Sequence, residues 1–119
     1  ADVHAGIDVL AVPSIWYENA PIAIQEAFRF GTPVVASDLG GMAEAVRDGV
    51  DGLLFRPGDA RDLARVLRRL VDEPGLVERL AANVPPVRDV DDNAAELEFR
   101  YRGLLARRAA SDPAPEVPR

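Results

Sequence analysis

Residues 16–27 join an apolar run to a helical pattern, and they read Trp16-Tyr17-Glu18-Asn19-Ala20-Pro21-Ile22-Ala23-Ile24-Gln25-Glu26-Ala27. Before this segment, residues 8–12 form a short apolar run that Pro13 ends, which is typical of a strand buried on both faces of a parallel sheet. Pro21 suits the first helical position, where its missing N–H has no partner to lose, and Gly31 suits the residue just after a helix end. The segment therefore predicts a strand, a polar loop over residues 14–20 and a helix.

The same alternation of apolar runs and helical patterns continues along the chain. Strands are expected over residues 32–36 and 53–55, with a turn over 37–41 and a short helix over 42–47 between them. Asp59 is a typical N-cap for the long helix that follows. Strands that alternate with helices predict an α/β fold, here a Rossmann-like parallel sheet with flanking helices.

Past a break at residues 73–75, the pattern predicts a helix over 76–83, a linker at Pro85 and Pro86, and a last amphipathic helix. That helix is marked by five apolar positions, Ala94, Leu97, Tyr101, Leu104 and Leu105. We expect residues 2–6 to be the end of a helix, residues 1–108 to be the C-terminal part of one domain, and residues 109–119 to be a disordered tail because prolines recur there.

Composition excludes several classes of function. The chain has 119 residues, a net charge of −6 and no cysteine, so disulfides, thiolate metal sites and cysteine nucleophiles are ruled out. The acidic balance argues against nucleic-acid binding, which needs clustered positive charge. No apolar run approaches the roughly 20 residues that span a bilayer, and the start lacks the pattern of a signal peptide. A cytoplasmic domain is expected.

Four arginines lie on the expected long helix: Arg61, Arg65, Arg68 and Arg69. They are compatible with an anion-binding face or with a solvated helix face whose cations favour the C-terminal end. The second interpretation is the more ordinary one, and it is favoured here.

Two strand-to-helix junctions, at residues 13–22 and 37–42, open on the same edge of a parallel sheet, where ligands of such folds bind. The helix start near Ile22 offers free N–H groups suited to phosphate, and Gly40 and Gly41 permit a close backbone approach. Glu18 and Glu26 can each accept hydrogen bonds from sugar hydroxyls. Together these groups predict a nucleotide-sugar site, although spacing alone leaves both glutamates open to a plain surface role.

Several motifs occur in the order found in one family: residues 8–14, the Glu18 and Glu26 pair, residues 31–37, Gly40-Gly41 with Glu44, and Pro57-Gly58-Asp59. In these the chain resembles the C-terminal, donor-binding part of the retaining glycosyltransferases with two Rossmann-like domains (GT-B type), the glycosyl transferases group 1. The resemblance runs over about residues 8–72, and more loosely to about Leu105.

The resemblance implies a role for each matching position. Glu18 would be the catalytic glutamate beside the donor sugar, and Glu26 would bind the ribose hydroxyls of the donor. The backbone of Asn19, Ala20, Pro21, Ile22 and Ala23 would meet the diphosphate and sugar, and Gly40 and Gly41 would keep a turn open near the donor pocket. Many relatives have glycine where Pro21 stands, so the N–H groups of Ile22 and Ala23 would carry the phosphate. No metal and no cofactor are implied.

The implied reaction moves a hexosyl group from a UDP-, GDP- or ADP-sugar to an acceptor hydroxyl with retention of configuration. The acceptor, a glycan, lipid or small molecule, would be bound by a separate N-terminal domain, and any peripheral membrane contact would go through that domain. Without the first half of the donor domain, one sheet edge should be open and apolar, and the chain alone should not turn over. Two alternatives stay open: a non-catalytic nucleotide-sugar-binding or scaffolding module, and a nucleotide-sugar epimerase of similar build.

Overall fold

A parallel sheet of three strands organises the first part of the chain. The structure, a computed structural model, describes residues 6–111. Its strands are β1 (Leu10–Val12), β2 (Val34–Ser37) and β3 (Gly52–Phe55), in the spatial order β1-β2-β3. The predicted parallel α/β sheet is confirmed. The helix end expected over residues 2–6 lies outside the described residues, apart from Gly6.

The register of the sheet brings three strand ends together. Val12 lies beside Ala36, and Ser37 lies beside Phe55, so all three strands finish at one edge. The loops that lead into the next helices leave from this carboxyl edge. In open α/β sheets this edge is where ligands bind.

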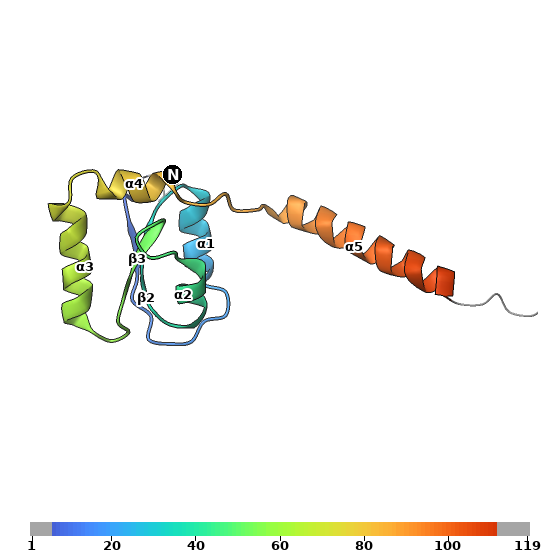
Figure 1. Ribbon diagram of the computed structural model, residues 1–119, viewed down its shortest axis with the longest axis horizontal. Helices are drawn as coiled ribbons and strands as arrows, with labels where there is room; N and C mark the ends of the chain where they lie inside the picture. The colour runs from blue at the N-terminus through green and yellow to red at the C-terminus, as the bar shows by residue number, and fades with distance from the viewer. Residues whose placement is uncertain (1–5, 112–119) are drawn as a thin grey trace, which may run out of the picture. The chain divides into compact units, whose positions relative to one another are not determined.

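Helices cover both faces of the sheet, as Figure 1 shows with the strands in the middle. On one face lie α1 (Ile22–Arg29) and α2 (Gly40–Ala45); on the other lie α3 (Ala60–Asp72) and α4 (Leu76–Ala82). Since successive strand residues point to opposite faces, Val34 of β2 packs in the core under α1 and α2, whereas Val35 packs in the core under α3 and α4.

Tertiary packing moves some boundaries from their predicted places. The helix α2 begins at Gly40 rather than at Met42, and Pro21 is the N-cap of α1 rather than its first helical residue. The buried face of α1 consists of Ile24, Ala27 and Phe28. Ile22 therefore stays exposed, on the face that looks away from the core.

The described chain divides after Val87, and the second unit is one helix, α5 (Val90–Ser111), with no buried residue. That residues 1–108 belong to one domain stays a prediction. The helix α5 is longer than the predicted one, and it covers the first three residues of the expected tail, 109–111. The rest of that tail lies outside the described residues. Glu96 bonds Arg88 and Arg100 within this unit, and these contacts hold its pKa below the usual range.

The outer side of β1 is an unpaired edge within the described sheet. Ala11 is exposed and Leu10 and Val12 are only half-buried, whereas every residue of β2 is buried. This agrees with the expected open apolar edge. Over residues 6–111, no helix combines the length and apolarity that crossing a bilayer requires.

Candidate functional site

The start of α1 has first-turn amides that no side chain caps. The N–H groups of Ile24 and Gln25 donate to the Pro21 carbonyl at 3.1 and 3.3 Å, so the amides of Ile22 and Ala23 have no acceptor within the helix. The first turn carries no acidic residue, and Pro21 provides no cap hydrogen bond. The helix dipole adds a partial positive charge at this point, which favours an anion.

The position of Pro21 corrects one expectation about these amides. The sequence placed Pro21 inside the helix, where its ring would remove one of the phosphate-binding N–H groups. In the structure Pro21 precedes the helix as its N-cap, with φ −69° and ψ 98°. The missing N–H therefore belongs to the cap residue, and the first-turn amides of α1 are all present.

The other two helices that begin at this edge have first-turn groups already engaged. The Asp59 carboxylate accepts from the N–H groups of Arg61 and Asp62 at the start of α3, at 3.0 and 2.9 Å. At the start of α2, the Gly41 N–H donates to the Glu18 carbonyl at 2.8 Å. Of the three junctions at this edge, α1 therefore offers the most open place for a phosphate.

Glu18 lies on the exposed loop between β1 and α1 and is held at two points. The Ser14 hydroxyl donates to Glu18 Oε1 at 3.2 Å, and it accepts a long hydrogen bond, 3.4 Å, from the Trp16 N–H. The Glu18 carbonyl is held by Gly41. The side chain and the backbone of Glu18 thus have separate supports, one from its own loop and one from α2.

The glycine pair makes a close approach to this loop. A Cβ atom on Gly41 would lie 2.3 Å from the Glu18 carbonyl oxygen and 2.8 Å from that of Asn19. Gly40 has φ +51°, and a Cβ there would meet the Tyr17 ring at 3.0 Å. The sequence predicted a close approach to a ligand, whereas the structure shows that the chain's own loop makes such an approach. Contact of Gly40 and Gly41 with a donor stays a prediction.

Glu26 lies on the exposed face of α1, one turn after Ile22. Residues four apart share a helix face, so Glu26 is on the side of α1 that carries Ile22 and not on the buried side. Its carboxylate makes no hydrogen bond or ion pair with the described residues. Asn19 and Ala20 are exposed in the loop that leads to the helix. The predicted residues 18–26 therefore follow one another through the loop and the first part of α1, and the exposed Glu26 carboxylate is available to a ligand.

Sequence reasoning missed the two supports of Glu18. Ser14 precedes Glu18 by four residues in a loop, a spacing without a general structural meaning, so no pattern indicated this contact. The Gly41 contact joins segments more than 20 residues apart. The glycine pair was a signal for a close approach, but a sequence does not distinguish a ligand from the chain itself as the neighbour.

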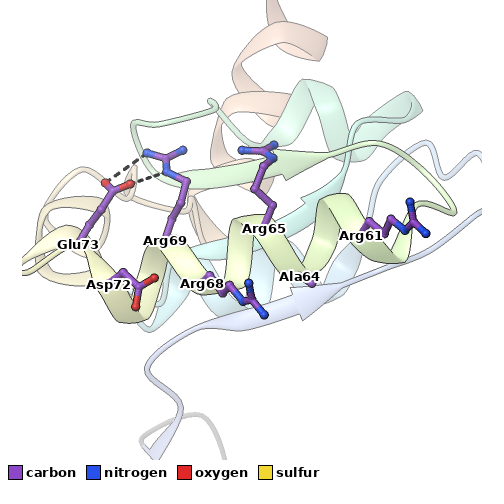
Figure 2. A pocket seen from close by; sticks show the side chains of 7 residues that line it. All are labelled: Arg61, Ala64, Arg65, Arg68, Arg69, Asp72 and Glu73. Carbon is purple, nitrogen blue, oxygen red and sulfur yellow. Dashed lines mark hydrogen bonds and ion pairs between the residues drawn. The ribbon is translucent and has the colours of Figure 1, made fainter.

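A hollow of about 600 Å³ lies on the outer face of α3, and no predicted site residue lines it. Figure 2 shows its arginines spaced along the helix, with Arg65 and Arg69 pointing to the same side. Arg69 bonds Glu73 at 2.6 Å, and Arg65 bonds Asp62 at 2.8 Å. The Arg69 contact lowers the pKa of Glu73, and the Arg56 N–H together with Arg65 lowers the pKa of Asp62. Two of the four arginines are thus paired with carboxylates of their own segment, which favours the solvated helix face.

The described residues contain no group of three His, Asp or Glu side chains placed to hold a metal ion. The groups that the carboxyl edge does offer are amides, carboxylates and a hydroxyl. Amides at a helix start bind anions, and carboxylates accept from hydroxyl groups. This edge therefore suits a ligand that combines a phosphate with hydroxyls.

Residues 1–85 match the protein family described as Glycosyl transferases group 1. One relative is a D-inositol 3-phosphate glycosyltransferase of Rhodococcus jostii, 43% identical over 84 residues, which are 71% of this chain and 18% of the relative. A protein of the same description from Actinosynnema mirum is 46% identical over 83 residues, 70% of this chain and 20% of the relative. The chain thus spans about a fifth of the length of these relatives.

Two solved structures are similar in fold and in sequence. Sucrose-phosphate synthase of Thermosynechococcus elongatus superposes with a TM-score of 0.74 and 32% identity, over 87% of this chain and 27% of that one. A HepE protein of Anabaena in complex with UDP-glucose has a TM-score of 0.64 and 33% identity, over 69% of this chain and 22% of that one.

Proposed function

The chain belongs to the glycosyl transferases group 1 family, and on that premise we propose that it is the donor-binding portion of a retaining glycosyltransferase. The reaction transfers a hexosyl group from a nucleoside-diphosphate sugar to an acceptor hydroxyl. The similarity to a protein solved with UDP-glucose supports a donor of this class. The donor is a substrate, and no cofactor enters the proposal.

One observation carries the proposal: the uncapped start of α1 is flanked by two exposed carboxylates. Glu18 precedes it in the loop, and Glu26 follows on the exposed face of the helix. A diphosphate at the amides of Ile22 and Ala23 would extend toward a hydroxyl-rich group on each side. A nucleoside-diphosphate sugar has this order, since ribose and hexose flank its diphosphate.

The residue roles follow from that order. Glu26 accepts hydrogen bonds from the ribose diol, and Glu18 accepts from the hexose that is transferred. The backbone of Asn19 and Ala20, which follows Glu18 in the loop, runs alongside the transferred sugar. Gly40 and Gly41 hold the Glu18 loop, a role that their close contacts with Tyr17 and Glu18 support, and they border the donor pocket. We also propose residues 1–108 as part of the donor domain.

The same proposal has three further parts. A separate N-terminal domain binds the acceptor, which is a glycan, a lipid or a small molecule, and any membrane contact is limited to that domain. The transferred sugar keeps its anomeric configuration. The cytoplasmic location expected from the sequence stays a prediction. Donor binding without turnover is the result expected for the 119-residue chain. Release of UDP or transfer of the sugar by this chain alone would contradict that expectation.

The test is donor binding by the chain and by Glu26→Gln. Saturation-transfer NMR with UDP-, GDP- and ADP-glucose measures the binding of each donor. Hydrogen bonds to charged groups contribute about 1.5–3 kcal/mol, and glutamine keeps one acceptor, so we expect binding about tenfold weaker. Glu78→Gln, an exposed change on α4, is the matched control and should bind as the parent does. Equal affinity in Glu26→Gln would refute the ribose assignment.

The two alternatives give different results in the same experiment. A nucleotide-sugar epimerase would convert the donor to an epimer of its sugar, which chromatography of the nucleotide sugars detects. A scaffolding module that has lost its ligand would show no saturation transfer to any of the donors. Donor binding that depends on Glu26 supports the proposal over a scaffolding module, whereas formation of any epimer would support the epimerase instead.

A further inference from the structure

An exposed patch of large apolar side chains lies in the candidate site and has no role in donor binding so far. Ile15, Trp16 and Tyr17 are consecutive and are 64%, 74% and 81% exposed. They belong to the loop that carries Glu18, at the carboxyl edge of the sheet. An indole buries about 150–250 Å² when it is covered, so leaving it in water forgoes a large favourable contact.

The backbone on either side of Trp16 is held although its side chain is free. The Trp16 N–H donates to the Ser14 hydroxyl, and the same hydroxyl donates to the Glu18 carboxylate. The Tyr17 ring lies against Gly40, and the next carbonyl is bonded by Gly41. The loop is thus fastened to α2 with the indole left in solvent, which is the arrangement of a preorganised contact surface.

The chemistry of the patch fits a ring-shaped polyol. A pyranose or cyclitol has a face of C–H groups that packs on an aromatic ring, and its hydroxyls need acceptors at the rim. Trp16 supplies the aromatic face, and Glu18, two residues away, supplies the acceptor. Sites for small polar molecules combine aromatic walls with a few placed polar groups in this way.

The order of groups along the loop indicates which ring this is. This step rests on the proposed function, which places the diphosphate at Ile22 and Ala23 and the transferred hexose at Glu18. Along the chain, Trp16 precedes Glu18, whereas the phosphate-binding residue Ile22 follows it. An extended chain from Ile22 to Trp16 would span at most about 20 Å. The group that lies beyond the transferred hexose is the acceptor.

We propose that Trp16 is the platform for the acceptor ring, so that this chain forms one wall of the acceptor site and selects a cyclic polyol or sugar over an open-chain alcohol. The proposal adds to an acceptor site otherwise assigned to a separate domain. It makes Trp16 a specificity-determining residue.

The test compares inositol with sorbitol, since each has six carbons and six hydroxyls and only inositol is a ring. With the 119-residue chain saturated by UDP-glucose, inositol should shift Trp16 emission and shield it from acrylamide, whereas sorbitol should do neither. In saturation-transfer NMR, Trp16→Ala should weaken inositol binding about 2- to 12-fold, the range of one aromatic contact, and leave UDP-glucose binding unchanged. The affinity of Trp16→Phe for inositol should lie between those of the parent chain and Trp16→Ala.

Phe99→Ala removes an aromatic side chain of similar exposure, 79%, from α5 and is the matched control. The amide resonance of Gly41 checks that each variant keeps the loop in place. The proposal is overturned if sorbitol binds as well as inositol or if Trp16→Ala leaves inositol binding intact. It is also overturned if inositol shows no binding at about 50 mM.

Loss of UDP binding in Trp16→Ala would also overturn the proposal, because it would assign the indole to the nucleobase. The measurement of UDP-glucose binding distinguishes a failure of this proposal from a failure of the proposed function. Failure of UDP-glucose to bind the parent chain refutes the proposed function, whereas failure of inositol alone refutes only the role of Trp16.

Discussion

Replacing Gly41 by alanine should displace the loop that carries Glu18. The added Cβ would lie 2.3 Å from the Glu18 carbonyl oxygen, so the two atoms must separate by at least about 0.7 Å to reach 3.0 Å, the shortest contact that real Cβ atoms show. Both neighbouring groups are backbone atoms, so no flexible side chain can absorb the shift. The hydrogen bond from the Gly41 N–H to this carbonyl should weaken or break.

Three terms set the effect on stability. The overlap forces a backbone shift that costs about 1–3 kcal/mol, and the lost hydrogen bond costs about 0.5–1.5 kcal/mol, whereas alanine in place of glycine in a helix recovers at most about 1 kcal/mol. The free energy of unfolding should therefore fall by about 1–3 kcal/mol. Affinity for UDP-glucose should fall by about tenfold or more, because a displaced Glu18 loses a charged hydrogen bond to the sugar.

The assay combines urea melts, donor titration and an NMR spectrum of backbone amides. We expect the resonances of Glu18 and Asn19 and the single indole signal of Trp16 to move in Gly41→Ala. Gly103→Ala is the matched control, since that glycine also lies in a helix and has open space around it. Unshifted loop resonances with unchanged donor affinity would refute the reasoning, because the clash would then have been absorbed elsewhere.

Three further predictions concern the scaffold. The pKa of Asp62 is lowered by the Arg56 N–H and by Arg65, so the stability that this carboxylate adds is present above about pH 4, its unfolded pKa, and is lost as pH falls through its folded pKa. Urea melts at pH 7 and 3 should therefore show a smaller loss of unfolding free energy between the two pH values in Asp62→Asn than in the exposed control Asp72→Asn. Equal losses in the two variants would contradict this. Asp51→Ala should lower the free energy of unfolding in urea melts by about 2–3 kcal/mol, because the buried Asp51 carboxylate accepts hydrogen bonds from the Arg47 backbone N–H at 2.8 Å and from the Arg47 side chain at 2.6 Å. A decrease of less than about 1 kcal/mol would show that water replaces these hydrogen bonds. The open edge at β1 should let the chain self-associate, so sedimentation at rising concentration should show larger species that Ala11→Lys reduces; a concentration-independent monomer would exclude this edge as the contact.

Element types were predictable here because local patterns agreed with the fold. Short β-rich runs bounded by Pro13 and Gly31 gave strands and a helix where the structure has them, and the Asp59 cap is present as predicted. Boundaries were less predictable. Pro21 is compatible with an N-cap and with a first helical position, and only the turn that leads into α1 selects between them. The separation of α5 into a unit of its own depends on contacts between segments, which a sequence pattern does not contain.

The sequence by itself determined the parallel α/β class and the family, because both depend on residue types in order along the chain. It also placed Glu18, Glu26 and the start of α1 at one edge, since parallel strands end together. Only the tertiary structure decided that Gly41 holds the Glu18 loop and that Ser14 bonds its carboxylate. It also decided that the first-turn amides of α1 stay uncapped while those of α3 are taken. Close approach and hydrogen-bond partners depend on distances between segments, and a linear order of residues does not contain those distances.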